Sequence, residues 1–384
     1  MSISMLKTLL TSTDPDNYDN YLNEKINYVT TLLRDSGIDF PAPEIFKSLK
    51  EHYRMRAEFS VFFNENASEL YYVMFEPHSK PKKKIIIDNF PIASVSINQA
   101  MQELKALIPD YPEIKNRLFE IDFLSNKKGE LIITLIYHRK LDELSWQKEA
   151  EVLRDLLSKR GLYVNFVARS KKQKILVSTD SLIEEIATDR QKFMLKQTEG
   201  NFSQPNISAC ENMVNFARKC CKDQSDKDLL ELYCGSGTFT VCLAGLFKKV
   251  LATEVSRTPT ENALFNIRNN EITNTQIVRL SAVEVAQALE NIRKFRRLEL
   301  AGININDYNF STLFIDPPRS GLQYKEALDF TAKFDRIIYI SCGKESFASD
   351  LKYLQKTHTV SKLAFFDQFP YTEHLESGAL LLKK

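Results

Sequence analysis

The second half of the chain alternates short apolar runs with longer segments of helical period, and this alternation restricts the fold more than any other feature. After a helix predicted at 206–222, five apolar runs each leave room for a following helix, whereas the last two runs have no such room between them. The runs lie at 229–233, 250–254, 276–280, 312–316, 337–341, 362–369 and 378–382. This order predicts an α/β fold, a mostly parallel seven-stranded sheet with one antiparallel strand at the end.

The first half of the chain has a different pattern. Charged or polar residues alternate with apolar ones over 54–62, as they do in a half-buried strand. We predict strands at 54–62, 69–75, 84–88, 117–124, 130–138, 163–168 and 174–178, and helices at 15–37, 97–108 and 146–159. Residues 1–190 are therefore predicted to form an antiparallel α+β domain and residues 191–384 the α/β domain, with irregular structure over about 180–205.

The composition limits the class of protein. Of the 384 residues, 43% are hydrophobic and 27% charged, which is typical of a globular protein, and no apolar run approaches the roughly 20 residues of a membrane helix. The six cysteines all follow residue 209 and show neither a C-x-x-C pair nor zinc-ligand spacing. We therefore expect a cytoplasmic protein with reduced cysteines, no metal, no iron–sulfur cluster and no membrane contact.

Basic residues are concentrated in the first half, although the net charge of the whole chain is only +2. Many of them fall at predicted strand ends or turns, near Tyr71 and Tyr72. The basic residues are Arg54, Arg56, Lys80, Lys82, Lys83, Lys84, His138, Arg139, Lys140, Arg169, Lys171, Lys172 and Lys174. Such loops suit a folded RNA, whose phosphates attract positive charge and whose unstacked bases pack on aromatic rings. The alternative is an ordinary solvated surface.

Two features of the second half predict a cofactor that carries a nucleoside. Gly235 and Gly237 follow the first predicted strand of this half, and glycines there let a cofactor approach the backbone at the start of a helix. Glu254 ends the next strand, where a carboxylate can accept hydrogen bonds from ribose hydroxyls. The third glycine of the dinucleotide fingerprint and the lysine of a phosphate-binding loop are both missing.

A third feature ends the fourth strand, where Asp316 is followed by Pro317, Pro318 and Arg319. Consecutive prolines cannot join a sheet, so they form a rigid rim that directs Asp316 into the cleft. Enzymes that methylate exocyclic amines have an aromatic residue where this chain has Arg319, which disfavours adenine as the substrate. The alternative is a plain strand terminus.

Cys342 ends the fifth strand, at the edge of the sheet where ligands bind in open α/β folds. The alternative is a small core residue, as most free cysteines are. Carbon 5 of uracil is too weak a nucleophile to accept a methyl group directly, but a thiolate that adds to carbon 6 makes it nucleophilic. A base must then remove the carbon 5 proton. The residues alone leave Glu373, His374 and Glu376 as equal candidates.

Taken together and in order, these motifs resemble those of the tRNA (uracil-5-)-methyltransferase family, which makes ribothymidine in the T loop of tRNA. The resemblance covers nearly the full length and implies an S-adenosylmethionine-dependent, Rossmann-like catalytic domain behind an N-terminal RNA-recognition domain. The matching motifs lie at 53–59, 122–125, 137–138, 202–206, 230–237, 316–322, 339–342 and 366–376.

The resemblance also implies roles for individual residues. Cys342 matches the nucleophile and Glu376 the proton acceptor. The positions that bind the cofactor and the target base are Gln204, Tyr233, Thr238, Glu254 and Asp316. The implied partner is the T arm of tRNA, with a T-like loop of transfer-messenger RNA as a further substrate, and we expect a monomer.

The chain departs from the family pattern at a few positions. Thr238 stands where asparagine is frequent, Glu373 where histidine is frequent, and Gly343 with Lys344 where asparagine and proline usually follow the cysteine. We hypothesise that Lys344 lowers the pKa of the thiol or contacts a phosphate.

Two other functions stay open at this point. Methylation of cytosine at carbon 5 uses similar covalent chemistry but usually needs a carboxylate that protonates ring nitrogen 3. The other is an RNA-binding protein with a vestigial methyl-transfer site, against which the presence of Cys342, Asp316 and Glu376 argues.

Overall fold

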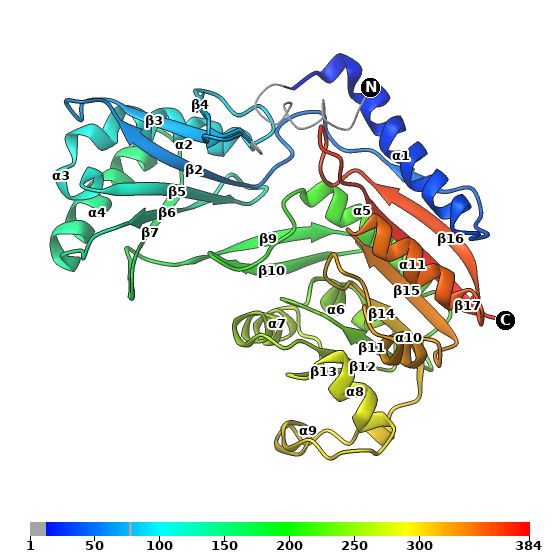
Figure 1. The fold of residues 1–384 in the computed structure, drawn as a ribbon. Coiled ribbons are helices and arrows are strands. Elements are labelled where there is room, and N and C mark those ends of the chain that lie inside the picture. The colour runs from blue at the N-terminus through cyan, green and yellow to red at the C-terminus, as the bar shows by residue number, and fades with distance from the viewer. Residues whose placement is uncertain (1–12, 77–78) are drawn as a thin grey trace.

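The computed structural model describes residues 13–76 and 79–384. These residues form an eight-stranded sheet, a seven-stranded sheet and a two-stranded hairpin (Figure 1). The seven-stranded sheet belongs to the first half of the chain, drawn in blue and cyan, and the hairpin lies between it and the rest of the molecule (Figure 1).

All seven strands predicted in the second half are present in the eight-stranded sheet. In spatial order the sheet contains β1 (Glu44–Phe46), β16 (His358–Phe366), β17 (Glu376–Lys383), β15 (Arg336–Ser341), β14 (Phe310–Ile315), β11 (Asp228–Leu232), β12 (Lys249–Thr253) and β13 (Thr275–Val278). The one antiparallel strand is β17, which pairs with β15 and β16. It lies inside the sheet and not at its end, because its apolar residues are buried on both faces.

The eighth strand, β1, was not predicted. It contributes three partly exposed residues that pair in parallel with β16, and so short a segment carries no periodicity. The first long helix, α1 (Tyr18–Asp35), lies within the range predicted for it and packs against α11 (Lys344–Leu354) (Figure 1). Residues near the N-terminus thus complete the C-terminal sheet.

Helices cover both faces of the eight-stranded sheet, as its apolar strands require. Leu230 and Leu232 belong to the core beneath α8, α10 and α11, whereas Leu229 belongs to the core beneath α5, α6 and α7. The helices of this half are α5 (Ile207–Cys220), α6 (Thr238–Leu243), α7 (Arg257–Asn269), α8 (Ala282–Leu289), α9 (Arg296–Leu300), α10 (Lys325–Thr331) and α11. Because β11, β12, β14 and β15 are parallel, their carboxyl ends meet at one edge.

The seven-stranded sheet confirms the α+β prediction, with one exception. Its strands in spatial order are β4 (Lys84–Ile87), β3 (Leu70–Phe75), β2 (Arg56–Phe63), β5 (Leu118–Ser125), β6 (Leu131–Tyr137), β7 (Val164–Ser170) and β8 (Gln173–Leu176). The helices of this part are α2 (Val95–Leu107), α3 (Pro112–Lys115) and α4 (Glu143–Lys159). Strands β6 and β7 are parallel, so the prediction of a wholly antiparallel sheet was wrong there. The reason is that α4 joins them, and a helical crossover returns the chain in the same direction.

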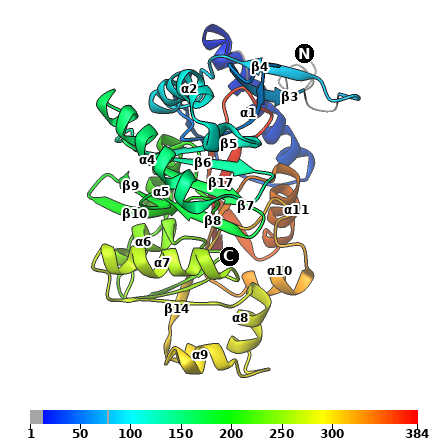
Figure 2. The same ribbon diagram turned by 90° about the vertical axis from the view of Figure 1, so that its left-hand side faces the viewer.

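The segment predicted to be irregular contains a hairpin, β9 (Ser181–Ala187) and β10 (Lys192–Thr198). Its period of two was hidden because Glu184 occupies one of the buried positions of β9. Strand β10 lies beside α7, on the same side of the molecule as α6 (Figure 2). The predicted domain boundary after residue 190 falls in the turn of this hairpin and stays a prediction.

None of the helices within residues 13–76 and 79–384 has the length and apolar composition that a membrane span needs.

Candidate active site

A cavity of about 800 Å³ opens at the carboxyl ends of the parallel strands. All seven residues predicted for the site line it: Gln204, Tyr233, Thr238, Glu254, Asp316, Cys342 and Glu376. The structure therefore brings together side chains from positions 204 to 376. Their individual roles stay predictions.

One half of the cavity is formed by the turn between β11 and α6 and by the end of β12. Gly237 is the N-cap of α6 at φ 81°, and a Cβ there would lie 3.1 Å from the Cβ of Ala263, so the turn needs glycine. The Glu254 carboxylate accepts hydrogen bonds from the backbone N–H of Gly235 (3.2 Å), Val255 (2.9 Å) and Ser256 (2.8 Å). These bonds fix the carboxylate beside the glycine turn.

This half fits a nucleoside. A carboxylate has about four acceptor positions, so Glu254 can accept from ribose hydroxyls in addition to its backbone partners. Pro259, Leu280 and Val283 add apolar groups to the same cavity, against which a flat ring can pack.

The Gln204 side chain is oriented by a residue that the sequence did not single out. The Gln368 amide N–H donates to the Gln204 carbonyl oxygen at 2.7 Å. Gln368 is fully buried and follows β16. Because its carbonyl is engaged, Gln204 presents its own amide N–H groups as donors. Gln368 lies within the 366–376 motif, but only the fold shows which side chain it meets.

Asp316 follows β14, and burial raises its pKa to about 7. The loop after it packs tightly on α11. A Cβ on Gly321, at φ 70°, would lie 2.6 Å from the Asp350 carboxylate. Asp350 in turn accepts from the Leu322 N–H at 2.9 Å and the Tyr339 hydroxyl at 2.6 Å. The loop is therefore held from both sides.

The same packing explains the glycine after the cysteine. A Cβ on Gly343 would collide with the backbone carbonyl of Arg319. The Ser346 hydroxyl also donates to that carbonyl at 2.7 Å. Gly343 thus lets the Arg319 loop approach the start of α11 closely, which a larger residue would prevent.

Cys342 follows β15 and is partly exposed, whereas the other five cysteines are buried. Burial, together with the carboxyl groups of Glu376 and Asp316, raises the pKa of the Cys342 thiol to about 11, and the Arg319 guanidinium opposes this shift. The thiol is therefore protonated at neutral pH.

Lys344 is not among the groups that act most strongly on the pKa of the Cys342 thiol. Its ammonium lies over the Tyr28 ring, 4.4 Å from the centroid. The cation that lowers the pKa of the Cys342 thiol is Arg319. In the sequence, Arg319 was notable only because it stands where enzymes that methylate exocyclic amines have an aromatic residue. A phosphate contact by Lys344 stays a prediction.

The geometry distinguishes the three candidate bases. Glu376 lines the cavity and is buried, and burial and the charge of Asp316 raise its pKa to about 8 against the influence of Arg319. His374 and Glu373 do not line the cavity. The His374 ring nitrogen Nε2 lies 3.4 Å from Arg319, and burial and that cation lower its pKa. Of the three candidates, only Glu376 lines the cavity.

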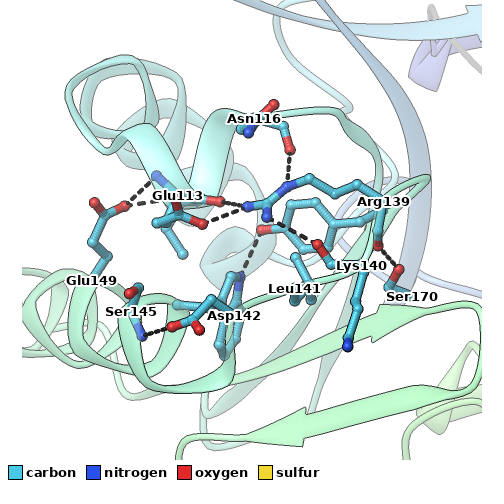
Figure 3. A network of polar contacts seen from close by, with 12 residues as sticks. Glu113, Asn116, Arg139, Lys140, Leu141, Asp142, Ser145, Glu149 and Ser170 are labelled. Atoms are coloured by element: carbon cyan, nitrogen blue, oxygen red, sulfur yellow. Dashed lines mark hydrogen bonds and ion pairs between the residues drawn. The ribbon is translucent and has the colours of Figure 1, made fainter.

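Some of the predicted RNA-binding residues are used inside the protein. The Arg139 guanidinium donates to the Asn116 carbonyl at 2.8 Å and the Glu113 carboxylate at 2.9 Å, within a network that ties α3 to the turn after β6 (Figure 3). Arg169 pairs with Glu199 at 2.6 Å. Both arginines thus satisfy neighbouring acceptors, but the Arg169 side chain stays 44% exposed, and RNA contacts by these two residues stay a prediction. RNA contacts by the remaining basic residues stay a prediction.

Within residues 13–76 and 79–384, no group of three or more His, Cys, Asp or Glu side chains is arranged to hold a metal ion.

Comparison with known proteins agrees with the resemblance seen in the sequence. The family model for tRNA (Uracil-5-)-methyltransferase matches residues 17–384. A protein of Acinetobacter baumannii named tRNA/tmRNA (uracil-C(5))-methyltransferase is 44% identical over 368 residues, which are 95% of this chain and 99% of the relative. A protein of the same name from Colwellia psychrerythraea is 42% identical over 370 residues, 96% of this chain and 98% of the relative.

The fold also matches a solved structure. The tRNA (uracil-54, C5)-methyltransferase of Pyrococcus abyssi, in complex with S-adenosyl-L-homocysteine, superposes with a TM-score of 0.68 at 19% identity. The match covers 95% of this chain and 84% of that one. At this identity the likeness concerns the fold.

Proposed function

We propose, because the chain belongs to the tRNA (uracil-5-)-methyltransferase family, that it transfers a methyl group from S-adenosylmethionine to carbon 5 of the T-loop uridine of tRNA. One observation carries the proposal. Cys342, Asp316 and Glu376 line the same cavity as the glycine turn and Glu254, so a thiol, two carboxyl groups and a nucleoside site meet in one place.

The reaction begins with Cys342. The thiol loses its proton to solvent, the thiolate sulfur adds to carbon 6 of the uracil ring, and the electron pair of the C5–C6 double bond moves toward carbon 4 as an enolate. Bound S-adenosylmethionine supplies the methyl group that carbon 5 takes up. Arg319, which opposes the rise in the thiol pKa, favours the thiolate in the first step.

Glu376 completes the reaction. Its carboxylate takes the proton from carbon 5, the C5–C6 double bond re-forms, and the sulfur leaves carbon 6. Because the Glu376 pKa is raised to about 8, the group holds a proton well once it has accepted it. The product is 5-methyluridine.

Two further residues are suited to hold the uracil ring. Gln204 offers amide N–H donors toward the ring carbonyls, since Gln368 occupies its own carbonyl. Asp316, with its pKa near 7, offers either a carboxylate acceptor or a carboxylic acid donor to the polar edge of the ring.

The RNA partner follows from the same comparison. The relatives are named for both tRNA and tmRNA, so we propose both RNAs as substrates. Within them the resemblance implies the T arm of tRNA and a T-like loop of transfer-messenger RNA. We also propose that the protein acts as a monomer. We place the protein with its RNA in the cytoplasm.

The test is nucleoside mass spectrometry of unmodified tRNA incubated with the protein and methyl-labelled cofactor. We expect labelled 5-methyluridine, and a loss on the order of a millionfold, to the detection limit, in Cys342→Ala, as for other catalytic nucleophiles. Cys220→Ala, in a buried cysteine remote from the cavity lining, is the matched control and should retain activity. Labelled 5-methylcytidine would support the cytosine alternative, and normal turnover of Cys342→Ala would reject covalent catalysis.

A further inference from the structure

Helix α1 places a lysine in the interior of the protein. The Lys25 side chain is only 3% exposed, and no other lysine or arginine in the described part of the chain is buried to this degree. Burial of an ammonium group is costly unless the group is paired and hydrogen-bonded.

The partners of Lys25 all lie in the turn between β16 and β17. Its ammonium pairs with the Asp367 carboxylate and donates to the backbone carbonyls of Phe369 and His374, each at 3.2 Å. These three contacts match the three N–H donors of an ammonium group. Asp367 and Phe369 lie in the first limb of the turn and His374 in the second, so one group ties the two limbs together.

Glu376 lies two residues after His374, the last of the residues that Lys25 contacts. It is the first residue of β17 and pairs with Phe366, the last residue of β16. The contact to the His374 carbonyl therefore fixes the backbone that enters Glu376. Lys25 itself does not line the cavity.

The rest of α1 also packs on this turn. Tyr371 has a φ of 61°, a left-handed conformation that is strained for a non-glycine residue and persists only where packing enforces it. The rings of Tyr18 and Tyr21 contact the Tyr371 ring edge-on, with centroids 6.1 and 6.2 Å away. Outside α1, the Tyr53 hydroxyl also donates to the Pro370 carbonyl of this turn, at 3.1 Å.

The same helix reaches the other side of the site. Tyr28 lies beneath the Lys344 ammonium, at the start of the helix that follows Cys342. Helix α1 thus contacts both the segment after the nucleophile and the turn before the proposed base.

We propose that Lys25 is a positioning residue that holds Glu376 at the correct distance from Cys342, and that it acts mainly on proton removal and release of the product. This inference rests on the proposed function. Lys25 acts through the 367–375 turn and touches neither RNA nor cofactor.

The test separates the two halves of the reaction in Lys25→Met under single-turnover conditions, with wild type and unmodified tRNA in parallel. Formation of the protein–RNA adduct that survives denaturant should change less than about threefold. Resolution of the adduct to free product should slow by about 100-fold, the loss expected from a misplacement near 1 Å, so the adduct accumulates. Lys47→Met is the matched control, because the exposed Lys47 pairs with Asp19 of helix α1 and lies outside the turn. This variant should change neither step.

A second variant distinguishes positioning from simple loss of stability. Lys25→Met leaves Asp367 as an unpaired buried charge, whereas Lys25→Met combined with Asp367→Leu removes both charges and should recover the melting temperature. We expect adduct resolution to stay slow in the double variant. Recovery of both quantities would overturn the proposal, as would normal resolution in Lys25→Met. Absence of any methylated uridine with the wild type would instead overturn the proposed function.

Discussion

The two halves of the cavity are built in different ways. The polar part of the half at β11 and β12 comes from residues within 25 positions of one another, from Tyr233 to Ser256, and its carboxylate is held by backbone N–H groups. The half at β14, β15 and β17 takes Asp316, Cys342 and Glu376 from three separate strands. The first half is a local motif, and the second exists only after the sheet has formed.

The electrostatics of the halves differ as well. Burial raises the pKa of Asp316 to about 7, and burial together with neighbouring carboxyl groups raises the pKa of Cys342 to about 11 and that of Glu376 to about 8, so at neutral pH Cys342 and Glu376 are mostly protonated and Asp316 about half. Glu254 is instead surrounded by three N–H donors. The half at β11 and β12 is therefore suited to binding a ligand, and the half at β14, β15 and β17 to transferring protons.

After the loss of the Cys342 nucleophile, Glu376→Gln should give the largest effect, and it should impair the second half alone. The amide keeps the size of the side chain but cannot accept the carbon 5 proton, so turnover should fall by about 100- to 10,000-fold. The measurement is gel electrophoresis in denaturant with labelled tRNA, where a stable protein–RNA adduct should accumulate. Glu373→Gln, in a neighbour that does not line the cavity, is the matched control. Rapid turnover without an adduct in Glu376→Gln would assign the base elsewhere.

The rate at which the adduct resolves should also depend on pH, with a smaller change than the one expected for Glu376→Gln. A base must be ionised, and burial raises the Glu376 pKa to about 8, so its ionised fraction increases with pH up to that value and then levels off. Resolution of a preformed adduct should therefore accelerate about tenfold per pH unit below pH 8. Stopped-time assays between pH 6 and 9 measure this rate. A profile that is flat over this range would contradict a base with a raised pKa.

Glu254→Gln should weaken the binding half and leave the chemistry nearly intact. Replacing a charged acceptor by an amide should raise the KM for S-adenosylmethionine by about tenfold, the value of one charge-assisted hydrogen bond. The maximal rate with saturating cofactor should change little. Glu261→Gln, at the exposed pair with Arg257, is the control and should leave both constants unchanged. An equal loss in the maximal rate would show that the halves are not separable.

Periodicity predicted long elements well and short ones poorly. The strands of the second half were found because their apolar runs have no other stable arrangement than a covered sheet. Strand β1 and the β9–β10 hairpin were missed, the first because three residues carry no period, the second because Glu184 replaces an apolar residue at a buried position. The position of β17 between β15 and β16 could not be predicted, because strand pairing depends on distant segments and not on local periodicity.

The sequence by itself determined the α/β order, the glycine turn with its strand-end carboxylate, and the presence of a cysteine at a strand end. These features depend on neighbours in the chain, so local periodicity and residue type are sufficient to predict them. The resemblance already implied Glu376 as the base, but only the tertiary structure decided that it faces the cavity while Glu373 and His374 do not, that Arg319 is the cation acting most strongly on the thiol, and that Lys25 anchors the turn before Glu376. Those choices depend on burial and on contacts between segments up to about 350 positions apart, which form only when the chain has folded.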